Sequence, residues 1–447
     1  MRFFSRKHQQ PQEPEHDNDE QPPTDSSESK GDLSKIVAEN DVAASANQAA
    51  GTAWLAGHLN HLTPEQEKKL VEFKALVEEK GYYKPGKEDG EPASHSDATL
   101  LRFLRARKFD VQGAYKQFTE TEDWRKENKI DDLYENIRLE PYERTRQMYP
   151  QWTGRRDRRG IPVYLFEVRH LTNKNVSNFS HEVSEKGASE THKDSAIPAR
   201  LLCLFSLYEN LLQFVHPLCS SLPRPNPETP IVSSNNIVDI SGVSLMQFWN
   251  LRSHMQDASV LSTAHYPETL DRIFIIGAPS FFPTVWNWIK RWFDPVTVSK
   301  IFILSSSEVK STLETFMEPS SIPSQYGGTL DFQWGDLPNL DDAALELAGG
   351  IISPPTSAGG KPQYLKGPMR FLGDRIEVLG TDQGKPRRAN IPVSVQKKGS
   401  EEPAEVAEDK EQSTTTLPVA TTQDPSEKLE QLETDAATAA TTTTATA

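Results

Sequence analysis

The stretch Asp294-Pro295-Val296-Thr297-Val298-Ser299-Lys300-Ile301-Phe302-Ile303-Leu304 places two hydroxyls and a cation directly before four apolar residues. The apolar run predicts a short strand, and three further β-branched or aromatic runs precede it in the chain, at Val163–Val168, Ile231–Ile240 and Arg272–Ile276. Helical patterns lie between and after these runs, at about 196–216, 244–264 and 308–317. Such alternation of strands and helices predicts an α/β fold with a mainly parallel sheet. The polar stretch 172–195 and the Pro-rich stretch 217–230 are expected to be loops.

A small helical domain is expected before the strands, over residues 63–135. Its first helix has a strong start, because Thr63 suits the N-cap, Pro64 the first helical position and Gln66 the capping box. Gly81 is a plausible end for this helix. Two more helical patterns follow, at 97–107 and 111–127.

The acidity of the chain is concentrated at its ends. The net charge is −15, of which residues 1–50 carry −5 and residues 396–447 carry −7, which leaves −3 for the middle. Residues 1–60 and the Thr/Ala-rich residues 396–447 are predicted to be disordered acidic tails. The α/β domain is expected over 145–332, followed by an extension at 333–395 that is partly packed. Within that extension, residues 349–388 are expected to add a short strand or collar to the body.

Composition excludes several classes of protein. A sequence pI of about 5.3 argues against a general nucleic-acid binder. Two cysteines, Cys203 and Cys219, cannot form a disulfide framework and fit a reducing cytosol. The N-terminus lacks the apolar core of a secretory signal, and Gly277, Pro279 and Pro283 interrupt the most apolar stretch, Ile273–Ile289.

The chain also lacks the common catalytic and phosphate-binding motifs. It contains neither a dinucleotide-binding glycine fingerprint, nor a P-loop, nor a nucleophile elbow, nor a zinc-binding helix. We therefore expect a protein that is not an enzyme and that needs no metal and no cofactor.

The helix predicted around Leu100–Phe109 contains three arginines. On a helical wheel Arg107 projects into the middle of the apolar face, whereas Arg102 and Arg105 point away from it. A charge aimed at an apolar face needs an anionic partner. The alternative is that Arg107 lies in the last turn, where a cation suits the helix dipole.

A second segment, Pro279–Pro295, is aromatic and bounded by prolines. One helical face gathers its large apolar side chains, with Trp292 at the border: Phe282, Val285, Trp286, Ile289, Trp292 and Phe293. Trp at the border of an apolar face is typical of a helix at a membrane interface. An ordinary core-facing helix has the same periodicity and remains the alternative.

Two charged residues precede predicted strands. Glu268 comes before Arg272–Ile276, and Lys300 comes before Ile301–Leu304. Open α/β sheets gather ligand groups at strand ends, although a solvated Glu and a snorkelling Lys are the common alternatives.

Several motifs together resemble the CRAL-TRIO family, and within it the fungal phosphatidylinositol/phosphatidylcholine transfer proteins. The resemblance covers about residues 63–332 and rests on motifs that occur in the family's order: 100–111, Trp124-Arg125-Lys126, Tyr149-Pro150-Gln151, 158–164, Asp239-Ile240-Ser241-Gly242, Tyr266-Pro267-Glu268, 294–304 and Gln325-Tyr326-Gly327-Gly328. It implies a helical module on an α/β lobe that encloses one phospholipid, with Pro279–Pro295 as the mobile gate helix.

The resemblance also implies the binding residues. The residues that match the family's phosphatidylinositol headgroup site are Arg107, Glu268, Thr297 and Lys300. Of the choline-lipid residues, Tyr164 and Ser234 match, whereas Thr153 stands where a Tyr is expected and Asn236 where a Thr is expected. Loss of an aromatic ring weakens the cation–π contact that a quaternary ammonium favours. The second ligand is therefore left open between phosphatidylcholine, a sterol and another hydrophobe.

The resemblance finally implies partners and a location. The expected partners are a phospholipid, a transient membrane surface and a phosphoinositide kinase, without nucleic acid. The expected location is the cytoplasm, with visits to Golgi, endosome or ER membranes. The alternative function is a carrier or sensor of a non-phospholipid such as a sterol or haem.

Overall fold

The computed structural model describes residues 52–87, 90–193, 195, 197–292, 298–353 and 363–394. Most of the two predicted disordered tails lies outside these ranges, and so do two of the predicted site residues, Phe293 and Thr297.

The N-terminal helices begin at the capping residues that the sequence predicts. The Thr63 hydroxyl accepts a hydrogen bond from the Gln66 amide, and the Gln66 side chain accepts one from the Thr63 amide. The helices of this part are α3 (Pro64–Glu79), α4 (Asp97–Ala106), α5 (Val111–Glu127), α6 (Ile130–Asn136) and α7 (Leu139–Arg146). Phe118 makes edge contacts with Phe73 and Phe103, and these contacts join α3, α4 and α5.

A mainly parallel sheet follows, as the strand–helix alternation predicts. Within the described residues its strand order is β1-β2-β3-β4-β5, with β1 antiparallel to β2 and all other pairs parallel. The strands are β1 (Gln151–Arg156), β2 (Pro162–Glu167), β3 (Ser234–Asp239), β4 (Leu270–Ile276) and β5 (Ile301–Leu304). The last of these has the bounds that its apolar run predicts.

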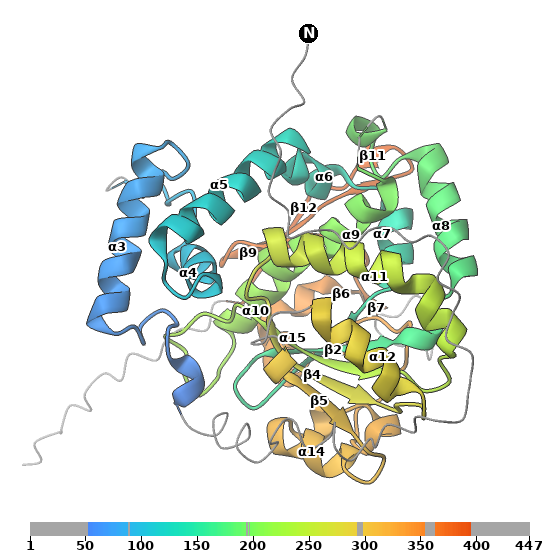
Figure 1. The fold of residues 1–447 in the computed structure, drawn as a ribbon. Coiled ribbons are helices and arrows are strands. Elements are labelled where there is room, and N and C mark those ends of the chain that lie inside the picture. Colours follow the sequence, from blue (N-terminus) through green and yellow to red (C-terminus); the bar gives the residue numbers. More distant parts are fainter. Residues whose placement is uncertain are drawn as a thin grey trace, which may run out of the picture. The chain divides into compact units, whose positions relative to one another are not determined.

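The connections between the parallel strands lie on one face of the sheet (Figure 1). Because each strand lies beside the preceding one and crossovers are right-handed, the connecting helices cover the same face. These helices are α8 (Asn173–Lys186), α9 (Ala199–Asn210), α10 (His216–Ser221), α11 (Leu245–His265) and α12 (Phe282–Ile289). A π-helical turn, η4 (Leu211–Val215), joins α9 to α10. α14 (Val309–Phe316) packs on the opposite face, where Leu313 and Phe316 contact Phe274.

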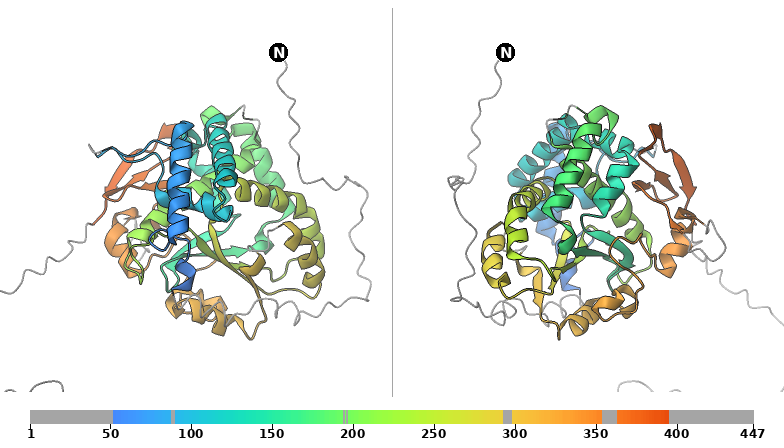
Figure 2. Two further views of the ribbon diagram at one scale, coloured as in Figure 1. Left: turned by 60° about the vertical axis from the view of Figure 1, so that its left-hand side comes forward. Right: turned by 90° about the vertical axis from the view of Figure 1, so that its right-hand side faces the viewer.

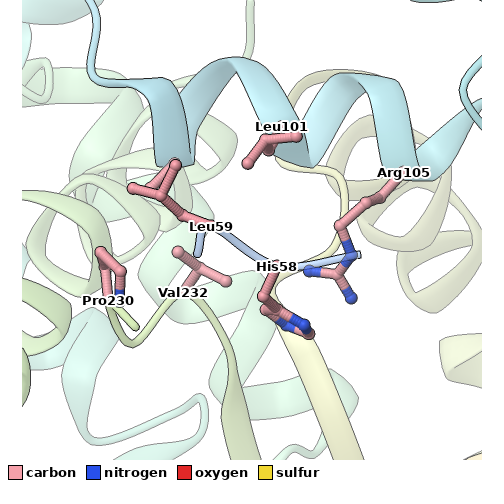
Figure 3. Close-up of a pocket in the computed structure, with 7 residues that line it drawn as sticks. His58, Leu59, Leu101, Arg105, Pro230 and Val232 are labelled. Atoms are coloured by element: carbon pink, nitrogen blue, oxygen red, sulfur yellow. The ribbon is translucent and has the colours of Figure 1, made fainter. Parts of the chain in front are cut away.

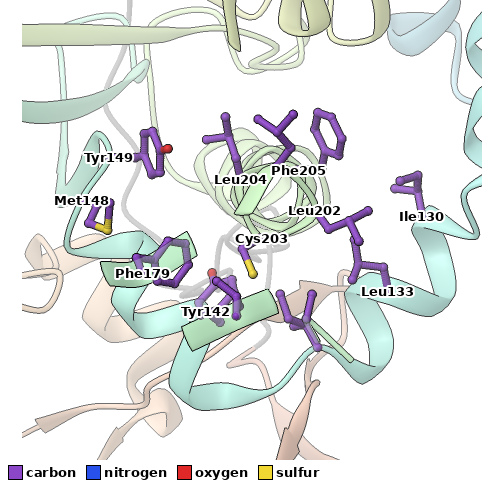
Figure 4. Close-up of a cluster of buried hydrophobic side chains, with 14 of the residues drawn as sticks. Ile130, Leu133, Tyr142, Met148, Tyr149, Phe179, Leu202, Cys203, Leu204 and Phe205 are labelled. Atoms are coloured by element: carbon purple, nitrogen blue, oxygen red, sulfur yellow. The ribbon is translucent and has the colours of Figure 1, made fainter. Parts of the chain in front are cut away.

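α9 is the centre of a large apolar cluster. Figure 4 shows Leu202 and Cys203 pointing from α9 toward side chains of the neighbouring helices, while Leu204 and Phe205 point to its other side. Those neighbours include Leu133 of α6 and Tyr142 of α7. The helical module and the α/β lobe therefore share one core around α9.

The extension after residue 333 packs on the lobe. It comprises α15 (Asp342–Ala348), the pair β6 (Ile352–Ser353) and β7 (Gln363–Tyr364), the sheet β8 (Met369–Phe371), β9 (Arg375–Val378) and β12 (Ala389–Pro392), and the hairpin β10 (Thr381–Asp382) and β11 (Lys385–Pro386). The Tyr134 hydroxyl of α6 donates to the Met369 carbonyl, and the Gly380 amide donates to the Glu135 carbonyl. Two views at different angles place this extension against the helices (Figure 2). These contacts give the extension the form of a collar.

The loop predicted over 172–195 is wrong, because α8 occupies most of it. Thr172 caps this helix by accepting a hydrogen bond from the Asn175 amide. Only Phe179 and Val183 of α8 are buried, so the polar outer surface hides the helical period in the sequence. The predicted loop at 217–230 likewise begins inside α10.

Candidate functional site

Charged side chains meet where β4 and β5 begin. Glu268 precedes β4, and its carboxylate lies 3.1 Å from the Arg105 guanidinium of α4 and 3.9 Å from the Lys300 ammonium. Lys300 also donates to the Leu270 carbonyl at 3.0 Å. Glu268 has a φ of +60°, a left-handed conformation that is uncommon outside glycine. The site thus lies at the amino ends of the parallel strands, and a strained residue stands at its centre.

Arg105, rather than Arg107, reaches Glu268. α4 ends at Ala106, and Arg107 is its C-cap residue, with φ −112° and ψ 21° and an exposed side chain. The helical wheel misplaces Arg107 because the residue is no longer helical. Burial lowers the pKa of the Arg105 guanidinium, and the carboxylates of Glu268 and Asp271 oppose that effect.

Of the four residues predicted for the phosphatidylinositol headgroup, the structure brings Glu268 and Lys300 together. Arg107 lies at the exposed rim, and Thr297 lies outside the described residues.

The residues predicted for a second lipid headgroup divide between the two faces of the sheet. Tyr164 and Asn236 are register partners on β2 and β3, and the Asn236 amide lies 3.4 Å from the Ser234 hydroxyl. Thr153 is opposite Val163 instead and donates to its carbonyl at 2.9 Å. Thr153 is therefore fully buried, and it does not join the other three.

The sheet face beneath α9, α11 and α12 is less completely buried than the opposite face. Side chains on the α14 face, such as Val163, Ile237 and Phe274, are fully buried. Alternating side chains on the other face keep partial exposure although helices cover it: Tyr164, Phe166, Asn236, Val238 and Ile273. The face beneath these helices is therefore the less completely covered of the two faces of the sheet.

α12 lies directly over this face. Phe282, Val285 and Trp286 are buried against Ile275 and Ile303. The described residues of the predicted gate thus point inward, as in an ordinary core-facing helix. The side chains of Ile289 and Trp292 lie outside the part that the structure describes, as does Phe293.

A buried ionic network supports the amino edge of the sheet. The Arg159 guanidinium donates to Asp157 at 2.7 and 2.9 Å and also pairs with Asp271. Burial would lower the pKa of Arg159, but the two carboxylates raise it above its ordinary value. The Asn235 amide donates to Asp157 at 2.9 Å, which ties β3 to the β1–β2 turn.

A second network joins the helical module to the Tyr-Pro-Glu segment. Glu209 of α9 accepts from both terminal nitrogens of Arg125, at 2.6 and 3.1 Å, and from the Tyr266 hydroxyl at 2.9 Å. Gln213 donates to the same carboxylate at 2.6 Å. Because Tyr266 is two residues before Glu268, this network fixes the approach of Glu268 to α4.

A small pocket opens beside Arg105 (Figure 3). His58 lies next to Arg105 in it, and Leu59 follows His58. The remaining lining comes from α4 and the segment before β3: Ala98, Leu101, Pro230 and Val232. Burial and the Arg105 charge lower the pKa of His58 to about 4, so His58 is neutral at pH 7. Sequence reasoning missed this pocket because His58 falls in the segment predicted to be a disordered tail.

Family models match both parts of this architecture. The CRAL/TRIO N-terminal domain matches residues 69–120, and the CRAL/TRIO domain matches residues 146–328. The chain therefore has the helical module and the lobe of one known class of fold.

Individual relatives agree with this class. The chain is 32% identical over 293 residues to the SEC14 cytosolic factor of Kluyveromyces lactis, which covers 66% of this chain and 88% of that protein. It is 32% identical over 273 residues to the Sec14 cytosolic factor of Schizosaccharomyces pombe, which covers 61% and 85%. A phosphatidylinositol/phosphatidylcholine transfer protein of Arabidopsis thaliana, SFH9, is 31% identical over 239 residues, 53% of this chain and 38% of that protein. The chain belongs to the CRAL/TRIO family, which confirms the resemblance and the expected α/β fold.

Among the described residues, none of the helices combines the length and the apolar character that crossing a membrane requires.

Proposed function

We propose that this protein binds one phospholipid, with phosphatidylinositol as the preferred headgroup, and carries it between membranes without chemical turnover. The observation that carries the proposal is the cluster of Arg105, Glu268 and Lys300 together with a partly exposed apolar sheet face. Two cations and one carboxylate leave one positive charge, which a phosphodiester of charge −1 balances. Relatives named as phosphatidylinositol/phosphatidylcholine transfer proteins support the same ligand class.

The physical need for an enclosed site follows from the cost of exposing acyl chains. A two-chain lipid presents on the order of 30 CH₂ groups, and at ~0.8 kcal/mol each their exposure to water costs ~24 kcal/mol. Enclosure beneath α12 removes most of that cost. We propose that α12 is the gate, which opens where its apolar face meets lipid and closes in water.

The headgroup would be held by charge and hydrogen bonds. Arg105 and Lys300 would face the phosphodiester, and Glu268 would accept from inositol hydroxyls. Thr297, which precedes Lys300 by three residues, is retained in the proposal as a hydroxyl donor. Arg107 is retained as an outer cation at the rim, where it would meet the headgroup during entry.

Vesicle transfer tests this assignment residue by residue. We expect Lys300→Ala and Arg105→Met to lower phosphatidylinositol transfer at least about tenfold. Arg107→Met should lower it by less, because that side chain is exposed. Lys310→Ala, an exposed lysine on α14, is the matched control and should transfer at the wild-type rate. Wild-type transfer by both Lys300→Ala and Arg105→Met would refute the site.

The polar group of a second ligand is proposed to lie near Tyr164, Ser234 and Asn236. Because Thr153 faces away, this site offers fewer contacts to a choline headgroup than the sequence match suggests. A sterol remains the alternative second ligand. Mass spectrometry of the lipid that co-purifies with the protein from its native host distinguishes them.

The protein is proposed to work in the cytoplasm and to visit membranes transiently, in line with relatives called cytosolic factors. Presentation of the lipid to a phosphoinositide kinase is a separate possibility. Assays of transfer and of lipid phosphorylation, with and without the kinase, separate the two: a presenter stimulates the kinase at protein levels that move little lipid between vesicles.

A further inference from the structure

Arg102 is a buried cation whose Nε has no hydrogen-bond partner among the described residues. It lies on α4 one turn before Arg105, and the residue is 5% exposed. Within the described part of the chain no hydrogen bond reaches its guanidinium, and its Nε is fully enclosed. A guanidinium has five N–H donors, and leaving a buried charged group unsatisfied is costly. The position therefore calls for a partner beyond the residues described.

The two carboxylates that act on Arg102, Glu209 and Glu268, are both engaged by other cations. Glu209 accepts four hydrogen bonds, two from Arg125 and one each from Tyr266 and Gln213. The other side of Arg125 faces Asp131, whose side chain is 73% exposed. Inside the protein, two guanidinium groups thus share one carboxylate, and one positive charge is left uncompensated. Burial lowers the pKa of Arg102 to about 10, which still leaves it charged at pH 7.

A second buried polar atom without a partner among the described residues is near enough to sense the Arg102 charge. His216 begins α10, two turns after Glu209 on the same run of helix, and it is 4% exposed. One ring nitrogen bonds the Ser233 main chain, while Nε2 has no partner in the described residues. Burial and the Arg102 charge lower the pKa of His216 to about 3, so the ring is neutral and Nε2 is an acceptor. Ser233 directly precedes Ser234 of the proposed second headgroup site.

We propose that Arg102 and His216 form a buried binding site for the phosphodiester of the enclosed phospholipid. A phosphodiester carries the single negative charge that this region lacks, and its oxygens match the fork of guanidinium donors. His216 Nε2 then accepts a hydrogen bond from a headgroup hydroxyl or from a water on the phosphate. A water molecule alone would satisfy the hydrogen bonds of Arg102 but would leave its positive charge without a counter-charge. The inference rests on the proposed function and concerns a phospholipid whose headgroup lies near Ser234 rather than at the Arg105 and Lys300 cluster, so that each way of binding balances one phosphodiester charge.

The test compares Arg102, whose Nε lacks a hydrogen-bond partner in the described residues, with Arg125, which pairs with Glu209. Full-length protein stripped of lipid is incubated with vesicles of phosphatidylcholine, with the same vesicles containing phosphatidylinositol, or with vesicles containing diacylglycerol of the same acyl chains. The protein is re-isolated and its lipid quantified. In Arg102→Met we expect at least about tenfold lower loading of one or both phospholipids and unchanged loading of diacylglycerol. The phospholipid that is lost identifies which headgroup the site holds.

Thermal unfolding of the lipid-free variants supplies a second readout. Arg102→Met removes an uncompensated charge, so its unfolding midpoint should equal or exceed that of the wild type. Arg125→Met removes the partner of Glu209, so its midpoint should fall. Arg102→Gln provides a second substitution with the same expectation as Arg102→Met.

The proposal is overturned if folded Arg102→Met loads both phospholipids like the wild type. It is equally overturned if both Arg102 variants unfold at lower temperature or lose diacylglycerol to the same extent, since Arg102 is then a structural counter-ion. Failure of the wild type itself to load either phospholipid would instead refute the proposed function.

Discussion

Glu209→Gln is a substitution for which the structure gives a large expected loss of stability. Glu209 is buried, and its carboxylate is the common acceptor of Arg125, Tyr266 and Gln213. Glutamine keeps the size of the side chain but removes the charge and replaces one acceptor oxygen with a donor. The buried guanidiniums of Arg125 and Arg102 then lose their shared counter-charge.

The magnitude follows from the cost of breaking a buried ion pair. Removal of one partner costs about 3–5 kcal/mol. For a folded body of about 300 residues, an unfolding entropy of ~2.1 cal/mol/K per residue gives ~0.6 kcal/mol per degree, so the midpoint should fall by about 5–8 °C. Thermal unfolding of lipid-free protein followed by circular dichroism measures this shift.

The pH dependence of the same pair supplies an independent check. Burial would raise the pKa of Glu209, but Arg125, together with the hydrogen bonds of Gln213 and Tyr266, holds it below the ordinary value of 4.5. A carboxylate with a lowered pKa stabilises the fold above its unfolded pKa, and that stability is lost as the pH falls through the folded pKa. The difference in the free energy of unfolding between wild type and Glu209→Gln should therefore be largest at pH 7 and shrink below about pH 4.5.

The control is Glu182→Gln, which breaks the exposed pair of Arg144 and Glu182. Exposed pairs contribute about 0–1 kcal/mol, so its midpoint should change by less than about 2 °C. If Glu209→Gln lowered the unfolding midpoint at pH 7 by no more than Glu182→Gln does, the assigned role of Glu209 would be wrong.

Three further substitutions test the collar, the first strand and the gate. Tyr134→Phe leaves the Met369 carbonyl short of a donor and should cost about 1–3 kcal/mol in urea unfolding, whereas no loss would show that the collar is held elsewhere. Gly154→Ala should cost roughly 1–3 kcal/mol, since φ is +86° and the new Cβ would lie 2.5 Å from the Asn339 backbone; a neutral result in the same assay would argue against that close approach. Trp286→Ala should weaken the docking of α12 by about 3–5 kcal/mol and speed the release of bound lipid in a stopped-flow fluorescence assay, and an unchanged release rate would argue against α12 as the gate.

The strands and the first helices could be predicted because their signals are local. Capping residues such as Thr63 act within one turn, and the run Ile301–Leu304 is apolar enough to mark its own ends. α8 and β1 carry weaker signals. α8 buries only Phe179 and Val183, and β1 contains Gly154.

The site was predictable only in part because its geometry depends on contacts between distant elements. Glu268 and Lys300 meet because both precede neighbouring parallel strands, and the sequence order predicts this. The choice among the arginines of α4 depends on where the helix ends and on which face meets the lobe. Arg102 and Arg105 are three residues apart and so share a face, which was the one available signal that they act together.

The collar has a consequence for the order in which the protein is made. Its strands β8 and β9 cover residues of η4 and α10, and its hydrogen bonds reach back to α6, which is more than 200 residues earlier in the chain. A ribosome adds about 5–20 residues per second, so η4 and α10 emerge roughly 8–30 s before β8 and β9 can cover them. During that interval Phe214 and Leu218 would lie open to water or to chaperones. Loading of a lipid is thus an event that follows synthesis of nearly the whole described body, and a chain truncated before Met369 should be captured by chaperones rather than by membranes.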